Sequence, residues 1–80
     1  MFKNKLESKN IYDVSNFNLY DINFLRLDRS HVLFEINVSY NNLKSIDILN
    51  QYFHLKIINA QNNHIKEVNL WLQKLEILNL

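Results

Sequence analysis

The fold of this chain is decided by residues 33–43, LFEINVSYNNL, and by residues 55–65, LKIINAQNNHI. Both stretches place apolar residues and one asparagine at the spacing L-x-x-L-x-L-x-x-N-x-L, with Ile, Val or Ala at some apolar positions. The second stretch begins 22 residues after the first. Self-similarity at a fixed period indicates a repeat architecture, in which each repeat is one supersecondary unit that stacks on its neighbours.

Two incomplete copies of the pattern flank the central pair. Upstream, three residues fit the same frame: Tyr12, Val14 and Leu19. Phe17 stands there at the position of the asparagine, and downstream the pattern starts again at Leu75 and runs to Leu80. We therefore divide the chain into an N-terminal flank, 1–8, and one repeat domain, 9–80, with units at about 9–32, 33–54, 55–74 and 75–80.

The start of each unit has the alternation of a β-strand with one buried face. In Glu35–Ser39 apolar and polar residues alternate, which predicts that Ile36 and Val38 point inward. The polar residues of this segment are then expected to face solvent: Glu35, Asn37 and Ser39. Stacked units would bring such strands together into a parallel sheet.

An asparagine follows each central strand. Its amide both donates and accepts, so Asn41 and Asn63 are expected to bind backbone groups of the turn and to form a short ladder. Phe17 cannot do this, so the first turn must be closed differently, and Asn16 and Asn18 are the candidates.

After each turn the apolar period changes to three or four residues, which predicts a short helix or 3-10 segment packed on the strands. One such stripe is Ile46, Leu49 and Phe53, and a second is Val68, Trp71 or Leu72, and Leu75. The first unit carries an irregular stretch, 26–32, that absorbs its two extra residues.

The spacing and unit length resemble the leucine-rich repeat family, over residues 9–80. The resemblance implies an α/β solenoid of about three and a half repeats, with a parallel sheet on its concave face and short helical or 3-10 segments on its convex face. The 22-residue form is similar to the short intracellular class, which includes a phosphatase regulatory subunit, a spliceosomal A-prime subunit and axonemal proteins. The last unit breaks off inside a predicted strand, which predicts a C-terminally truncated array.

Composition excludes several kinds of site. The chain has no Cys, Gly or Pro, which removes disulfides, thiolate zinc sites, phosphate loops and dinucleotide fingerprints. A net charge of +1 argues against a nucleic-acid partner. The three histidines have no partner at zinc-ligand spacing: His31, His54 and His64. We expect no catalysis, no cofactor, no metal and no small-molecule substrate.

The chain also lacks the sequence features of export and membrane insertion. The basic residues near Met1 are not followed by an apolar run, as they would be in a signal peptide. No stretch approaches the roughly 20 apolar residues that span a bilayer. These observations predict a cytoplasmic protein.

Equivalent strand positions should form columns on the concave face. The three columns are Ile11, Glu35, Ile57 and Ile77; Asp13, Asn37, Asn59 and Asn79; and Ser15, Ser39 and Gln61. Solenoid proteins bind extended partners on such surfaces. The expected protein-binding residues are Asp13, Glu35, Asn37, Ser39, Tyr40, Ile57, Asn59 and Gln61. For Asn37 and Asn59, hydrogen bonding along the stack is an equally good explanation.

Two aromatic residues receive different predictions. Tyr40 occupies a variable turn position beside the sheet, so we expect it to be exposed and to anchor a partner. Trp71 lies on the helical stripe and is expected in the core. The predicted function is therefore a non-catalytic protein-interaction module. Two alternatives remain: a structural subunit of a cytoskeletal or axonemal complex that self-associates through the open edge at Leu80, and a fragment of a larger regulatory protein.

Overall fold

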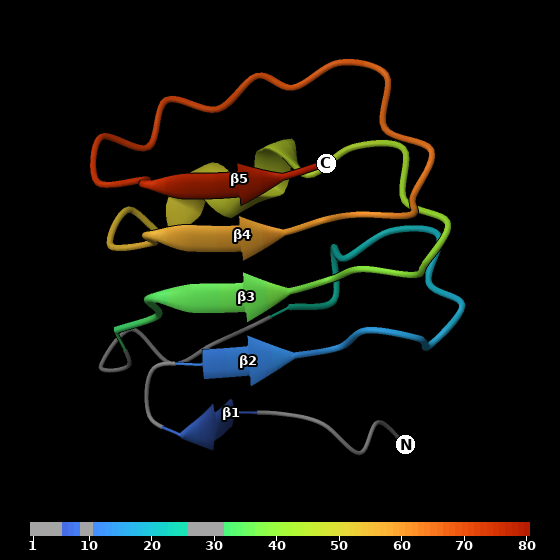
Figure 1. Ribbon diagram of the computed structural model, residues 1–80, viewed down its shortest axis with the longest axis horizontal. Helices are drawn as coiled ribbons and strands as arrows, with labels where there is room; N and C mark the ends of the chain where they lie inside the picture. Colours follow the sequence, from blue (N-terminus) through green and yellow to red (C-terminus); the bar gives the residue numbers. More distant parts are fainter. Residues whose placement is uncertain (1–5, 9–10, 26–31) are drawn as a thin grey trace.

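The computed structural model describes residues 6–8, 11–25 and 32–80, which form one open sheet of five strands (Figure 1). The strands lie side by side in chain order: β1 (Leu6–Ser8), β2 (Ile11–Asp13), β3 (Glu35–Asn37), β4 (Ile57–Asn59) and β5 (Ile77–Asn79). The described chain is a small α/β-like domain with a four-stranded parallel sheet, β2 to β5, and little helix.

The register of the parallel strands confirms the first two predicted columns. Across β2, β3, β4 and β5, one row pairs Ile11, Glu35, Ile57 and Ile77, and another pairs Asp13, Asn37, Asn59 and Asn79. Strands separated by 24, 22 and 20 residues thus occupy equivalent places. β1 falls inside the predicted flank and pairs antiparallel with β2, an element that the repeat pattern did not predict.

The inward side chains of the strands form a single core. Ile36, Val38 and Ile58 are fully buried, as the alternation predicts. Leu75 and Leu78 of the fourth unit are partly buried against this core, and the first three units add these buried residues: Val14, Ile22, Leu25, Leu33, Leu43, Ile46, Leu49, Leu55, Ala60 and Leu72. Tyr12 of β2 packs against this core, and burial together with the neighbouring Tyr52 raises the pKa of its phenol. The units therefore share one core and do not bury separate ones.

Asparagines close the turns, as expected, but they do so for the preceding unit as well as for their own. Asn63 Nδ2 donates to the carbonyls of Ala60 (3.1 Å) and Val38 (3.0 Å), and its Oδ1 accepts from the Leu43 N–H (2.9 Å). The expectation that Asn16 or Asn18 closes the first turn is wrong. Asn41 of the next unit does so, because its Oδ1 accepts from the N–H groups of Phe17 and Leu19.

The turns also share a backbone conformation. Asn16, Tyr40 and Asn62 lie at equivalent positions, and all three have positive φ, 63°, 58° and 61°. Asparagine adopts this left-handed region more readily than most residues, whereas a tyrosine there is strained. The same turn geometry is thus built three times, and only Tyr40 adopts it at a conformational cost.

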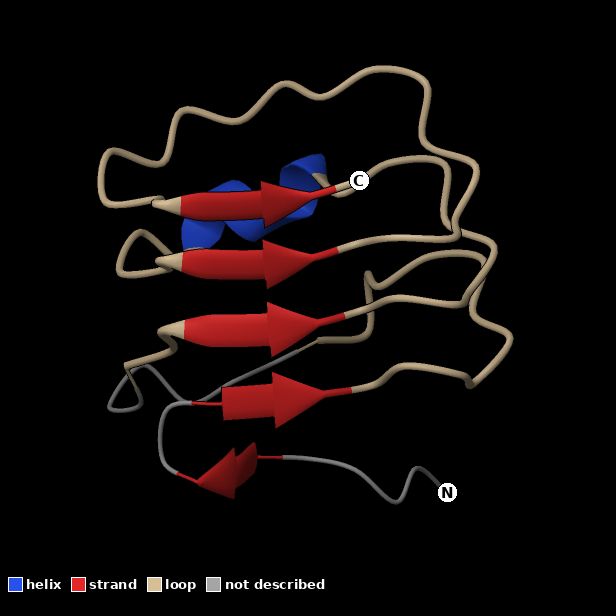
Figure 2. Ribbon diagram, viewed as in Figure 1, coloured by secondary structure: helices blue, strands red, loops and turns tan. Residues whose placement is uncertain are grey.

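The first predicted helical stripe is confirmed as a 3-10 helix, η1 (Asp47–Gln51), which lies behind the sheet in Figure 2. Ile46 directly before it and Leu49 within it are buried, but Phe53 is 66% exposed and does not continue the stripe. A turn at Phe53 and His54 leads the chain away from the helix before Leu55 re-enters the core.

The second predicted helix, along residues 68–75, is wrong. Side chains of η1 bind the backbone of this segment instead. Asn50 Oδ1 accepts from the Trp71 N–H (2.9 Å), and Asn50 Nδ2 donates to the Asn69 carbonyl (2.8 Å). Asp47 Oδ1 accepts from the Asn69 N–H (3.0 Å). Backbone N–H and C=O groups that an α-helix would pair internally are thus hydrogen-bonded to side chains of the preceding unit.

The burial of this segment follows a period of two. Val68 and Leu70 are half-buried and Leu72 is buried, while Asn69 and Trp71 between them are exposed. Trp71 is 73% exposed, so the prediction that it lies in the core is wrong. The alternation V-N-L-W-L was a strand-like signal in the sequence, and the three- and four-residue spacing of the same apolar residues masked it.

Some predictions fall outside the described residues. The irregular stretch of the first unit lies mostly there, since residues 26–31 are not described, and so does His31. The predicted start of the first unit at residue 9 also lies outside the described residues, and the unit bounds stay predictions.

Candidate functional site

The candidate site is the side of the sheet that faces away from the core. We call it the open face and define it by the outward residues of β2 to β5: Ile11, Asp13, Glu35, Asn37, Ile57, Asn59, Ile77 and Asn79. Alternation along each strand places these side chains opposite to the buried Ile36 and Ile58. The face is half-buried at most positions and exposed at Ile77, which is 46% accessible.

The open face is chemically graded from β2 to β5. Asp13 on β2 and Glu35 on β3 carry carboxylates, and neither has a cationic partner among the described residues. Asn37 and Asn59 follow in the same row as Asp13, and Ile57 and Ile77 make the β4–β5 end apolar. Both carboxylates therefore lie at the β2–β3 end, beside Ile11, and the β4–β5 end combines Ile57 and Ile77 with Asn59 and Asn79.

The row of Asp13, Asn37 and Asn59 is held by local turns. In each case a side-chain oxygen accepts from the backbone N–H two residues later: Ser15 (2.9 Å), Ser39 (3.0 Å) and Gln61 (3.3 Å). This is the usual Asx-turn bond. The Asn37 and Asn59 side-chain oxygens thus accept hydrogen bonds within their own turns. They do not bond along the stack, which was the alternative explanation for these two residues.

Ser39 is buried, with 4% exposure, although the alternation predicted that it faces solvent. Its hydroxyl donates to Asn37 Oδ1 (2.6 Å), and its carbonyl accepts from the N–H of Asn16 (3.2 Å). Flanking units cover it on both sides. Ser39 therefore holds the turn and offers no side-chain surface to a partner.

Tyr40 and Gln61 lie beyond the strand ends and are exposed, Tyr40 to 56%. Tyr40 is exposed as the sequence predicted. A backbone hydrogen bond joins the two residues, since the Tyr40 N–H donates to the Gln61 carbonyl (2.9 Å). They extend the site from the sheet onto the turns.

The described residues hold no group of three or more His, Asp or Glu side chains that could bind a metal. His54 lies in the turn before Leu55, where its Nδ1 is 3.5 Å from Lys74 Nζ, and His64 is exposed. The described part of the chain also contains no helix long and apolar enough to cross a membrane.

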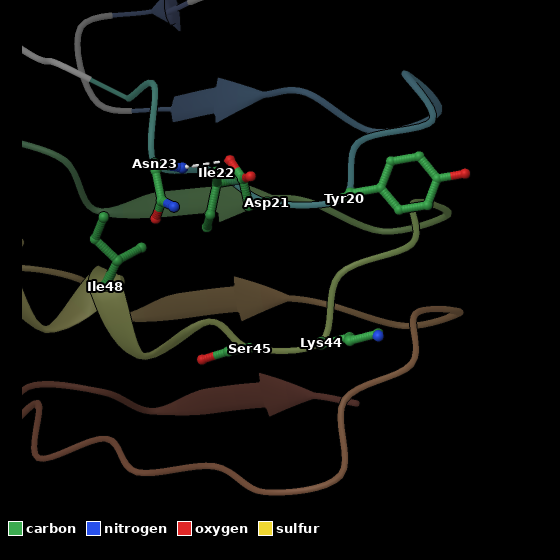
Figure 3. A pocket seen from close by; sticks show the side chains of 7 residues that line it. All are labelled: Tyr20, Asp21, Ile22, Asn23, Lys44, Ser45 and Ile48. Carbon is green, nitrogen blue, oxygen red and sulfur yellow. Dashed lines mark hydrogen bonds between the residues drawn. The ribbon is translucent and has the colours of Figure 1, made fainter.

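A hollow of about 300 Å³ lies between the loops that follow β2 and β3 (Figure 3). Its lining residues are Tyr20, Asp21, Ile22, Asn23, Lys44, Ser45 and Ile48. Asp21 Oδ1 accepts from the Asn23 N–H (3.1 Å), and Figure 3 shows the Tyr20 ring and the Lys44 ammonium pointing away from Ile22. Its polar groups do not converge, so we assign it no ligand.

Sequence reasoning identified the columns but missed how their amides are oriented. The signal was present, because Asp13-x-Ser15 and Asn37-x-Ser39 are both Asx-turn patterns at the end of a predicted strand.

Comparisons of the chain with protein-family models, with curated proteins and with solved structures find no match.

Proposed function

We propose that this chain is a leucine-rich repeat module, a non-catalytic solenoid segment that binds a protein partner through its open face. The in-register strands, the repeated turn and the asparagine closures support the repeat assignment. The open face is the concave surface in this proposal. Its contact residues are Asp13, Glu35, Asn37, Tyr40, Ile57, Asn59 and Gln61.

The strained Tyr40 is the observation that carries the proposal. At the equivalent position the neighbouring units have Asn16 and Asn62, which suit a positive φ, whereas Tyr40 holds φ 58° with a mostly exposed ring. A left-handed conformation costs an ordinary residue roughly 1–2 kcal/mol. Strain retained at an exposed position is typical of functional sites, and aromatic rings are common binding hot spots.

A substitution at this position separates function from stability. Tyr40→Asn should raise the free energy of unfolding by about 1 kcal/mol, because it relieves the backbone strain. It should also weaken binding of a peptide selected on the wild-type protein from a displayed random library, by about tenfold or more, because the ring is lost. Urea denaturation and a fluorescence titration measure the two effects.

Two further variants control this test. Tyr40→Ala removes the ring but keeps a strained side-chain-bearing residue, so it should weaken binding without the gain in stability. Phe53→Asn removes an exposed aromatic of the turn after η1, outside the open face, and should leave binding unchanged. A Tyr40→Asn protein that is less stable and binds the peptide normally would show that the ring serves the fold.

Placing Arg at Asn37 and Asn59 is a poorer test of the open face, since both side-chain oxygens close turns. Glu35→Arg with Gln61→Arg is the better way to add positive charge, because no hydrogen bond within the described chain depends on either side chain.

The alternative is a structural subunit that contacts a second copy of the chain through β5. β5 is the last strand of the described sheet, and Ile77 and Leu80 are exposed beside it. Unpaired strand edges invite pairing with another chain. Sedimentation equilibrium tests this alternative: an apparent mass that rises with concentration, and that Leu80→Lys returns to the monomer value, supports it.

A further inference from the structure

We propose that the open face selects an extended peptide with a basic residue at the β2–β3 end, an apolar residue at the β4–β5 end, and backbone carbonyls between them. The proposal names the partner class for the protein-binding function proposed above and rests on it. Three features of the face carry the proposal, and they are independent of the Tyr40 argument.

The first feature is the unpaired acidic end. Asp13 uses Oδ1 for the Ser15 N–H (2.9 Å) and hydroxyl (2.7 Å), which leaves Oδ2 available. Glu35 lies on the neighbouring strand, two residues away in register from the partner of Asp13. No cation of the described chain contacts either carboxylate. Two carboxylates on adjacent strands, neither contacted by a cation of the described residues, attract a basic side chain, and an Arg or Lys there makes charge-assisted hydrogen bonds.

The second feature is a pair of outward amide donors. Asn37 Oδ1 is fixed by the Ser39 N–H (3.0 Å) and hydroxyl (2.6 Å), and Asn59 Oδ1 by the Gln61 N–H (3.3 Å). Each oxygen is thereby committed to its own turn, so the group each residue offers to a partner is Nδ2. No acceptor within the described residues contacts either Nδ2. A partner over β3 and β4 must therefore present hydrogen-bond acceptors, and the carbonyls of an extended backbone are such acceptors.

The third feature is the apolar end. Ile57 on β4 is half-buried and Ile77 on β5 is 46% exposed, and the two are direct register partners. β2 and β5 are three strand spacings apart, about 14 Å at ~4.8 Å each. An extended peptide covers that distance in about four residues at ~3.3 Å per residue. The preferred segment therefore has Arg or Lys and a large apolar residue about four positions apart.

The side chains of this row allow isosteric substitutions that keep the turns. Asp13→Asn retains an oxygen for Ser15 but replaces the outward carboxylate oxygen by a donor. Asn59→Asp retains the oxygen for Gln61 but replaces the outward donor by an acceptor. Gln51→Glu on η1 is the matched control, since it makes the same amide-to-carboxylate change on an exposed residue of the other layer.

The probes are two synthetic peptides, one with Arg and Leu four positions apart and one with Glu in place of Arg. We expect the Arg peptide to bind at least tenfold more tightly, with shifted amide signals on β2 to β5. Asp13→Asn should remove most of that preference. Asn59→Asp should weaken binding of the Arg peptide at physiological salt, because the outward donor is lost. The attraction of the new carboxylate for the Arg is largely screened, since the two lie about a Debye length apart. Gln51→Glu should change nothing.

The possible outcomes test the proposed partner class and the proposed function separately. Equal affinity of the two peptides, or an Arg preference that survives Asp13→Asn, overturns the proposed partner class while signals on the open face still support the function. If neither peptide shifts the open-face signals, both proposals fail.

Discussion

At the scale of single residues, Asn41 is the side chain that ties two units together. Its Nδ2 donates to the carbonyls of Val14 (3.0 Å), Val38 (3.0 Å) and Ser39 (3.2 Å). Its Oδ1 accepts from the N–H groups of Phe17 (3.0 Å) and Leu19 (2.9 Å). Because the residue is only 6% exposed, water cannot replace these bonds.

We therefore predict that Asn41→Asp is strongly destabilising. The substitution keeps the acceptor but points an oxygen at three carbonyls in a buried site, and we expect a loss of about 3 kcal/mol or more. A core this small supplies about 3–5 kcal/mol, so the variant should be largely unfolded by circular dichroism at room temperature.

Two other asparagines calibrate this prediction. Asn63→Asp affects a half-buried side chain and should cost less, while Asn62→Asp changes an exposed turn residue and should cost under about 0.5 kcal/mol. If Asn41→Asp were as stable as Asn62→Asp, the closing role assigned to Asn41 would be wrong.

The chemistry of the Asn41 amide predicted that it binds backbone groups of its own turn. It did not predict that the same side chain also binds backbone groups of the first unit. An amide after a strand must bind nearby backbone, and that local argument was correct. The contribution of Asn41 to the first turn depends on a strand 24 residues away in the chain, through the pairing of β2 with β3. For the same reason Ser39 was expected at the surface, since alternation within one strand does not include cover from neighbouring units.

At the scale of elements, the bracing of residues 68–75 by η1 has a pH dependence. The Asn69 backbone N–H (3.0 Å) and side-chain amide (3.1 Å), with a contribution from Ser45, lower the pKa of the Asp47 carboxyl. A carboxyl with a lowered folded-state pKa stabilises the fold at pH values above its unfolded pKa, about 3.9. That stabilisation is lost as the pH falls through the folded-state pKa.

We predict that Asp47→Asn reduces the acid sensitivity of the protein. The wild type should be the more stable protein at pH 6, and the difference should shrink as the pH falls below the unfolded-state pKa, about 3.9, and through the lowered folded-state pKa of Asp47, where the wild-type carboxyl becomes protonated. Urea midpoints measured across this range test the prediction, with Glu67→Gln, one residue before the braced segment, as the control. A stability difference that stays constant with pH would contradict the role given to the Asp47 charge.

The sequence predicted one of the two expected helical segments correctly and the other incorrectly, for a physical reason. In residues 45–49 Ile46 and Ile48 fit a period of two, while Ile46 and Leu49 fit a helical spacing. In residues 68–75 both periods fit the apolar residues, and the choice is made by polar side chains of the preceding unit, Asp47 and Asn50. A single segment read alone contains no information about those partners.

At the scale of the whole molecule, the sheet is open at both ends of the strand order, but its two edges differ. β1 runs antiparallel along the β2 edge, whereas β5 has no further strand beside it in the described sheet. Repeat spacing predicted the order and register of β2 to β5, because each unit must stack on the next to bury its apolar side. β1 lies outside the repeat pattern, so spacing could not predict it.

The measurement that tests the central claim most directly is an amide chemical-shift map of the ¹⁵N-labelled protein, recorded while the Arg peptide is added. We predict that the largest changes fall on β2 to β5 and on Tyr40 and Gln61, with little change along η1. Changes confined to η1, residues 66–75 or the outer edge of β5 would place binding on another surface and contradict the claim that the open face is the binding site.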